Sequence, residues 1–395
     1  MTTESILTSP EESTEFQTEQ VLPIAGAHFI HDMYTAAVPA LLPIIMEKLS
    51  LSLTMVGSLM AIHQIPGILT PFIGYLADRV SLRYFVILAP AVTATLIGSL
   101  GFASNYVSLA IILFVTGISV ACFHVPAPAM IARVSGNQVG KGMSYFMAAG
   151  ELSRSVGPLL AVWAVSTWTL DGFYRVAVVG WAASLILYFR LRNIPARVEQ
   201  PMGFRSMVPL LRSVFVPLFV LMFFRIFLRE SLTTFLPTYM NIEGANLWLA
   251  GGALAILEFA GVGGALASGT LSDRFGRKLV LLVATVSGAF FTLVFLQVDG
   301  WSTFVVLVVL GFTVLSSGPV LLALVQDHFQ KNRAVGNGMF MMVNFLVRPI
   351  ALIAIGYLGD NYGLDKVFFW SAIISLFSIP AIFALPKLSS ETSTT

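Results

Sequence analysis

Long apolar stretches separated by short polar turns run through nearly the whole chain. A helix needs roughly 20 mostly apolar residues to cross the hydrocarbon core of a bilayer, and an open strand there would leave backbone groups unpaired. The pattern therefore predicts an all-α integral membrane protein. Its 12 expected spans cover residues 21–46, 54–77, 84–103, 107–132, 142–166, 174–191, 213–241, 246–271, 279–297, 302–326, 336–359 and 367–386.

The only long polar break divides these spans into two sets of six. It predicts an N-terminal six-helix half at 21–191, a linker at 192–212 and a C-terminal six-helix half at 213–386. Residues 387–395 form a short tail. Residues 1–20 are polar and acidic, so we expect a disordered tail rather than a signal peptide.

A charged turn occurs at equivalent places in the two sets. Residues Gly74 to Arg83 and Gly269 to Lys278 share the pattern of a glycine followed by Asp-Arg, at an offset of 195 residues. Val139 to Met143 is similarly repeated at Val335 to Met339. These matches predict two halves that arose by duplication.

Composition narrows the class of protein. Hydrophobic residues make up 57% of the chain, charged residues only 11%, and the mean hydropathy is +0.86, whereas soluble domains are about 25% charged. The single cysteine excludes a disulfide framework. There is no GxxxxGK[ST] loop and no polar catalytic domain. We therefore expect no enzyme, no nucleic-acid binding, no cofactor, and no ATP-driven pump unless another subunit supplies the ATPase.

The placement of Lys and Arg predicts the orientation. With the N-terminus inside, 15 of the 22 Lys and Arg residues fall in cytoplasmic loops and tails, and three fall in outer loops. Cytoplasmic loops of membrane proteins are enriched in these residues. We expect a multi-pass inner (plasma) membrane protein with both termini in the cytoplasm, acting as a monomer among membrane lipids.

The repeated turn resembles the signature of the major facilitator superfamily. The second copy fits throughout, while the first departs at Ser81 and Leu82. The resemblance implies two six-helix repeats with a substrate site between them near mid-membrane. It also implies that the two turns latch an inner gate. The gating residues would be Gly74, Asp78, Arg79, Arg83, Gly269, Asp273, Arg274, Arg277 and Lys278.

A narrower resemblance is to the fosmidomycin resistance protein group of bacterial efflux transporters. It rests on residues 27–33, Phe123-His124, residues 155–161 and the turn at 273–278. In that group the Phe-His pair is followed by proline and glutamate, whereas Val125 and Pro126 follow here. The resemblance therefore implies shared ancestry, but it does not imply that fosmidomycin is the substrate of this chain.

Eight charged residues lie inside the expected spans, where each costs several kcal/mol unless it faces a partner or a cavity. They are Asp32, Glu151, Glu230 and Glu258, against Arg154, Arg225, Arg229 and Arg348. The balance of four negative and four positive charges predicts a paired network.

Two groups in this set are candidates for proton coupling. Asp32 is accompanied by His28, four residues earlier on the same helix face, and by His31. A static Asp–His cluster is the structural alternative. Glu151 is the second candidate, with Arg154 three residues on as its counter-charge, and an intrahelical salt bridge is the alternative there.

The arginines are candidates for substrate binding. Arg225 and Arg229 are four residues apart, and guanidinium groups match the oxygens of carboxylates and phosphonates. Solvation near the outer mouth is the alternative for Arg229 and Glu230. Arg348 either contacts substrate or satisfies a carbonyl freed by Pro349. Arg154, Tyr34, Glu258, Glu230 and His124 complete the expected substrate-binding set, although His124 fits a core histidine equally well.

These features predict a secondary active transporter driven by the proton gradient, exporting a small anionic or amphiphilic compound such as a drug or metabolite by alternating access. The alternatives are an uptake symporter for an organic anion and, more remotely, a transport-inactive receptor. No histidine pair has the spacing of a helical metal site, so no metal is expected.

Overall fold

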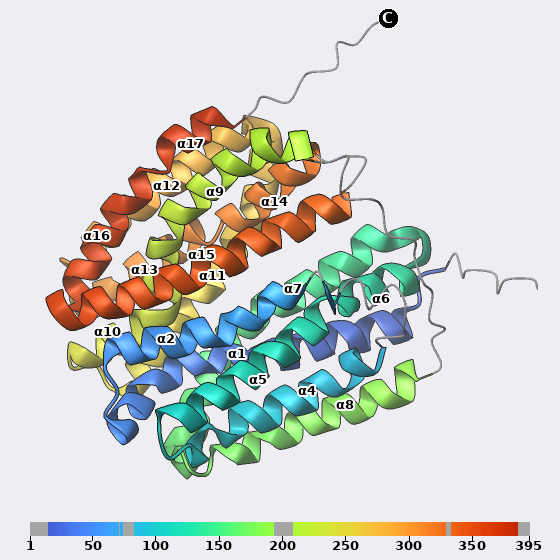
Figure 1. Cartoon of the computed structure of the whole chain (residues 1–395), viewed down its shortest axis with the longest axis horizontal. Coiled ribbons are helices and arrows are strands. Elements are labelled where there is room, and N and C mark those ends of the chain that lie inside the picture. Colours follow the sequence, from blue (N-terminus) through green and yellow to red (C-terminus); the bar gives the residue numbers. More distant parts are fainter. Residues whose placement is uncertain (1–14, 71, 74–82, 193–207, 329–332, 386–395) are drawn as a thin grey trace, which may run out of the picture.

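The computed structural model describes residues 15–70, 72–73, 83–192, 208–328 and 333–385. Within these ranges the chain forms helices and short connections, with no strand (Figure 1). The predicted all-α class is therefore confirmed.

The first half of the chain forms one bundle of helices (Figure 1). Its elements are α1 (Thr18–Leu49), α2 (Leu53–Gln64), η1 (Ile65–Leu69), α4 (Arg83–Gly98), η2 (Ser99–Phe102), α5 (Tyr106–His124), α6 (Pro126–Val134), η3 (Gly136–Gln138), α7 (Val139–Trp168), η4 (Phe173–Val176) and α8 (Ala177–Leu191).

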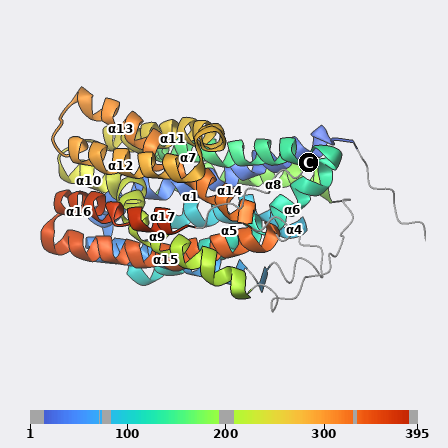
Figure 2. The same cartoon turned by 90° about the horizontal axis from the view of Figure 1, so that it is seen from above.

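The second half forms the other bundle. Its elements are α9 (Val208–Glu230), η6 (Ser231–Phe235), α10 (Leu236–Ile242), α11 (Leu247–Phe275), α12 (Arg277–Phe295), α13 (Trp301–Val314), α14 (Ser317–His328), α15 (Arg333–Tyr362), α16 (Leu364–Leu376) and α17 (Ile379–Ala384). The view from above shows helices of both halves running along one common direction (Figure 2).

These helices account for the predicted spans. Within the described ranges, nine stretches are long and apolar enough to cross a membrane, and Leu53–Leu69 is a shorter apolar one. The other two expected spans are α7, and α9 with its continuation through η6 and α10. These two contain most of the intramembrane charges, which lower their mean hydropathy.

Two spans are interrupted near functional candidates. Proline lacks a backbone donor and its ring clashes with the preceding turn, so α5 ends at His124 and α6 begins at Pro126. After Glu230 the chain passes through the π-helical turn η6 before Pro237. Such π-turns inside helices often occur at functional sites.

The two bundles pack closely through α2 against α15 and α7 against α11. A Cβ added to Gly57 would lie 2.2 Å from the Leu352 carbonyl oxygen, and one added to Gly356 would lie 2.3 Å from that of Leu53. Glycine is therefore required at both positions. These approaches lie toward one end of the bundles, here called the far end.

The opposite end is where α1 begins, α8 ends and α9 begins, and it is called the linker end. Figure 1 shows α2 and α15 side by side at the far end, and the ribbons of the two halves separating toward the linker end. The charged residues described next lie on helices of both halves, including α1, α7, α11 and α15, which contact the other half.

Candidate functional site

Asp32 lies at the centre of three imidazole rings. Its carboxylate oxygens are 3.1 Å from His28 Nε2, 2.9 Å from His31 Nδ1 and 3.3 Å from His124 Nε2. The side chains of His28 and His31 are 6% and 0% exposed, and those of Asp32 and His124 are 16% and 25% exposed. The predicted grouping of His28, His31 and Asp32 on α1 is therefore present, with His124 of α5 added to it.

Ring packing and backbone contacts fix the imidazoles. His28 stacks on Phe146 at a centroid distance of 3.9 Å, and His31 stacks on Phe123 at 4.5 Å. His28 Nδ1 lies 2.8 Å from the carbonyl oxygen of Phe146. A Cβ on Gly150 would lie 2.4 Å from His28 Cε1, so this glycine of α7 makes room for the ring.

On α7, Arg154 forms an ion pair with Glu151 at 2.6 Å. The intrahelical salt bridge considered from the sequence is therefore present. Both side chains remain partly exposed, at 34% for Arg154 and 26% for Glu151. The pair can thus be reached by a polar ligand.

Glu230 and Arg348 form the corresponding pair in the second half. Arg348 Nε lies 2.8 Å from Glu230 Oε1, and the Thr234 hydroxyl donates to Glu230 Oε2 at 2.9 Å. The Glu230 side chain is 0% exposed, so the alternative that it is solvated near the outer mouth is wrong for this residue. Arg348 pairs with a carboxylate rather than with the carbonyl freed by Pro349.

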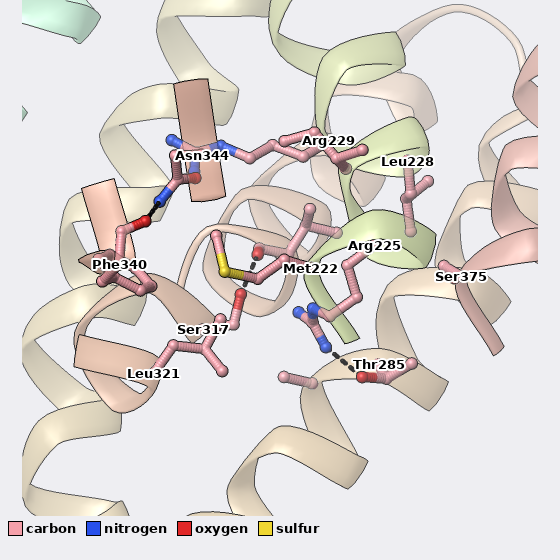
Figure 3. Close-up of a pocket in the computed structure, with 14 residues that line it drawn as sticks. Met222, Arg225, Leu228, Arg229, Thr285, Ser317, Leu321, Phe340, Asn344 and Ser375 are labelled. Atoms are coloured by element: carbon pink, nitrogen blue, oxygen red, sulfur yellow. Dashed lines mark hydrogen bonds between the residues drawn. The ribbon is translucent and has the colours of Figure 1, made fainter. Parts of the chain in front are cut away.

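Arg225 and Arg229 line one pocket inside the second half, between α9, α12, α14 and α15 (Figure 3). The Arg225 guanidinium donates to the Thr285 hydroxyl and to the Leu281 carbonyl oxygen. Ser317, Asn344 and Ser375 add polar groups to the walls. Neither arginine forms an ion pair with a carboxylate among the described residues.

The pocket is small in this conformation. Its volume is ≈ 50 Å³, which is room for a few water molecules. Figure 3 shows the Arg229 side chain extending toward Asn344 and the Arg225 side chain directed toward Thr285. An anionic substrate would therefore need this pocket to widen before it could reach both guanidinium groups.

Charges of the two halves face each other at longer range. Arg229 interacts electrostatically with Arg154 and with Arg348, and Glu258 of α11 with all three of these arginines. Glu258 is only 7% exposed. Across this region no direct ion pair joins the halves in the described part of the chain: Arg154 pairs with Glu151 of its own half, and Arg348 with Glu230 of its own half.

The structure does not place Tyr34 with the other candidates. Its ring is 0% exposed, its hydroxyl donates to the Val176 carbonyl oxygen at 2.5 Å, and it accepts from the Gly180 N–H at 3.2 Å. Tyr34 therefore holds α1 against η4 and α8 within the first half. In this conformation it does not line the space between the halves.

The second copy of the repeated turn braces its own half. Gly276 has φ +90, a conformation that favours glycine, and it separates α11 from α12. Arg277 pairs with Asp273 at 2.6 Å and with Asp327 of α14 at 3.2 Å.

Other residues of the two turns have more local roles. Lys278 Nζ donates to the carbonyl oxygens of Phe383 and Leu385 at 3.0 and 2.5 Å. Arg274 lies over the Phe275 ring, and Gly269 has open space around it. In the first copy, Gly74, Asp78 and Arg79 lie outside the described residues, while Arg83 begins α4. The latch role remains a prediction.

Several partners could not be found from the sequence. His124 is 92 positions from Asp32 along the chain, and Thr285, Asn344 and Asp327 are each 50 or more positions from the arginines they accompany. The only feature of the sequence that pointed to these partners was a histidine or polar residue on a helix that also carries prolines or glycines. That signal does not name a partner.

Comparison with known proteins agrees with this geometry. The family model described as Major Facilitator Superfamily matches residues 24–352. The chain is 24% identical to the fosmidomycin resistance protein of Escherichia coli (strain K12) over 385 residues, 91% of each chain. It is 23% identical to the uncharacterised MFS-type transporter YfnC of Bacillus subtilis (strain 168), over 93% of each chain.

Solved structures share the fold. A bacterial homologue of the human lysosomal transporter Spinster, in an inward-facing and unoccupied conformation, superposes with a TM-score of 0.78 at 13% identity, covering 94% of this chain and 98% of that one. A D-xylose–proton symporter gives 0.74 at 17% identity, covering 96% and 98%. With its paired helical halves and a family match over most of its length, this chain belongs to the Major Facilitator Superfamily of membrane transporters.

Proposed function

We propose that the protein is a secondary active transporter of the inner membrane that exports a small anionic or amphiphilic compound in exchange for protons. The observation that carries this proposal is a set of three arginines, one from the first half and two from the second, that are near enough to influence one another electrostatically. Arg154 of the first half interacts electrostatically with Arg229 of the second, and Arg229 with Arg348. An anion between the halves would interact favourably with all three.

The partly exposed side chains make such a site reachable. Arg154 is 34% exposed and Arg348 is 33% exposed, although both lie near the middle of long membrane helices. A guanidinium group offers a planar fork of donors that suits carboxylate and phosphonate oxygens. The Arg225–Arg229 pocket extends this positive region into the second half.

Glu258, Glu230 and His124 surround the arginines and would set which anion fits. Glu258 interacts electrostatically with Arg154 and Arg229, and Glu230 holds Arg348 at 2.8 Å. His124 is 25% exposed beside Asp32. A substrate bound here would compete with the carboxylates for the guanidinium groups, which gives a physical route for gating.

Export is supported by the relative named as a fosmidomycin resistance protein, and coupling by the protonatable groups of the first half. Asp32, Glu151, His28 and His31 are the proposed proton-coupling residues. The tight packing at the far end and the separated ribbons at the linker end suit alternating access. The distribution of Lys and Arg supports a cytoplasmic linker end.

Proteoliposomes with an imposed pH gradient of either sign test the proposal, with a panel of phosphonates, carboxylates and cationic dyes. Movement of an anionic compound against the proton flow supports antiport. Movement with the proton flow supports the uptake symporter instead. No movement of any compound and no proton flux in either direction would contradict a carrier.

Substitution of Arg225 tests the anion site. We expect Arg225→Ala to raise the half-saturating concentration of an anionic substrate by about 10- to 100-fold, because a hydrogen bond to a charged group contributes roughly 1.5–3 kcal/mol. Arg192→Ala is the control, since Arg192 is exposed at the end of α8. An unchanged value for Arg225→Ala would remove this arginine from the site.

A further inference from the structure

The contacts of His28 and His124 determine where their protons lie. His28 Nδ1 is 2.8 Å from the Phe146 carbonyl oxygen, and His124 Nδ1 is 3.1 Å from that of Val120. A carbonyl oxygen only accepts, so both Nδ1 atoms must carry a proton and donate it. If either ring were neutral, its Nε2 would present a lone pair.

Both Nε2 atoms nevertheless point at the carboxyl group of Asp32. The separations are 3.1 Å for His28 and 3.3 Å for His124. A lone pair facing a carboxylate oxygen at this distance is repulsive, so each contact needs a proton between its two atoms. Either both rings are charged, or Asp32 is protonated toward one ring and the other ring is charged.

The two arrangements hold the same number of protons. Each arrangement contains two more protons than a site with an ionised Asp32 and two neutral rings. This holds for both because a protonated Asp32 can donate to only one of the Nε2 atoms. His31 differs from the other two histidines. Its Nδ1 donates to Asp32 at 2.9 Å, and its buried Nε2 has no hydrogen-bond partner among the described residues, so it fits a neutral ring.

We propose that His28, His124 and Asp32 together store two protons in this conformation, with His31 as a neutral positioning residue. This inference rests on the proposed function, since a carrier driven by protons must hold them at a defined place. It adds His124 of α5 to the proton-coupling residues proposed on α1, and it gives His31 a positioning role in place of a proton-carrying one.

The surroundings suit storage and release. His124 is the more exposed of the two rings, at 25% against 6%, so it is the exchange point with solvent. Arg154 of α7 interacts electrostatically with both Asp32 and His124. If the Arg154 guanidinium group moved toward Asp32, it would replace the protons as the counter-charge of the Asp32 carboxylate.

Other ionisable groups lie on the elements around the store. Glu151 of α7 holds Arg154, Glu258 of α11 interacts with Arg154, and His63 of α2 lies near His31. The charged residues of α4, α6 and α8 are Arg83, Arg133, Arg190 and, next to α8, Arg192, all toward the linker end of those helices. Tyr239 is the ionisable residue of α10, near the far end.

Histidine ring-nitrogen NMR on the full chain in lipid nanodiscs tests the proposal. With ¹⁵N-labelled histidine at pH 7.5, we expect His28 and His124 to show the two-proton arrangement, with each Nε2 in a proton-bearing hydrogen bond. His31 should carry one proton, on Nδ1. The chain has only 5 histidines, so single His→Gln variants assign the signals.

His63 is the matched control. It is also buried, but its Nδ1 faces the Gln64 amide nitrogen at 3.2 Å rather than a carboxylate. It should remain neutral, with its proton on Nε2. Asp32→Asn should return His28 and His124 to single protons on Nδ1 without changing His63, a result that loss of packing alone would not give.

Two results would overturn the proton store: neutral rings with bare Nε2 atoms in the unsubstituted protein, or Nε2 signals that change when a chelator removes a bound divalent metal ion. The measurement needs no substrate, so it is separate from transport. Proton-driven transport with neutral rings would contradict the store alone. Charged rings without transport would contradict the proposed function alone.

Discussion

Asp360 of α15 caps the first turn of α2, in the other half of the protein, by accepting hydrogen bonds from Thr54. The Asp360 carboxylate accepts from the Thr54 N–H at 2.8 Å, from the Thr54 hydroxyl at 2.5 Å and from the Leu53 N–H at 2.8 Å. Helix N-termini favour a negatively charged partner. A helix cap therefore doubles as a contact that holds the far end shut.

Removing this charge should loosen the far end. A capping interaction contributes about 1 kcal/mol. We therefore expect Asp360→Asn to lower the ratio of molecules closed at the far end to molecules open there by about 5-fold. Spin labels at Glu47 and Asn361, both exposed, would report the distance across that end in a Cys122→Ser background. Asp299→Asn, an exposed carboxylate in the turn before α13, should leave the distance distribution unchanged.

Adding a methyl group at Gly57 should prevent closure directly. The new Cβ would lie 2.2 Å from the Leu352 carbonyl oxygen, which is backbone and cannot turn aside. We expect Gly57→Ala to separate α2 from α15 and to lower the transport rate at least 10-fold. Gly252→Ala is the matched control, because nothing lies within 4 Å of its added Cβ. Equal rates in the two variants would show that this approach is not needed for transport.

Neutralising Glu230 should destabilise the second half. Glu230→Gln leaves Arg348 without its anionic partner, and removing one partner of a buried ion pair costs about 3 kcal/mol. The midpoint of thermal unfolding should therefore fall. Thr234→Val removes only the hydroxyl that donates to Glu230 Oε2, so its effect should be smaller. A larger loss for Thr234→Val would mean that the hydroxyl, rather than the ion pair, holds Glu230.

Lys278 should keep the C-terminal helix docked. Its ammonium group donates to the carbonyl oxygens of Phe383 and Leu385 at the end of α17, where carbonyl groups lack helical partners. We expect Lys278→Met to raise the rate of limited proteolysis near α17 about 5-fold, the equivalent of about 1 kcal/mol. Lys366→Met, at an exposed position in α16, should leave the rate unchanged.

Some of the candidate site could be predicted from spacing along one helix. His28 with Asp32 and Glu151 with Arg154 are four and three residues apart, so the helix itself brings them together. The solvated alternative for Glu230 was wrong because η6 and α15 enclose that carboxylate. Tyr34 was expected near the substrate, but α8 and η4 take its hydroxyl.

The sequence by itself determined the class of the protein. Hydrocarbon forces every backbone group to be paired within its own segment, so apolar length alone predicts helices, and the repeated charged turn indicates a duplicated transporter. Only the tertiary structure decided which charges meet. His124 reaches Asp32, and Asp360 reaches Thr54, across distances along the chain that helical periodicity does not relate. Those pairings depend on how whole helices pack, which is set by many weak contacts summed over both halves.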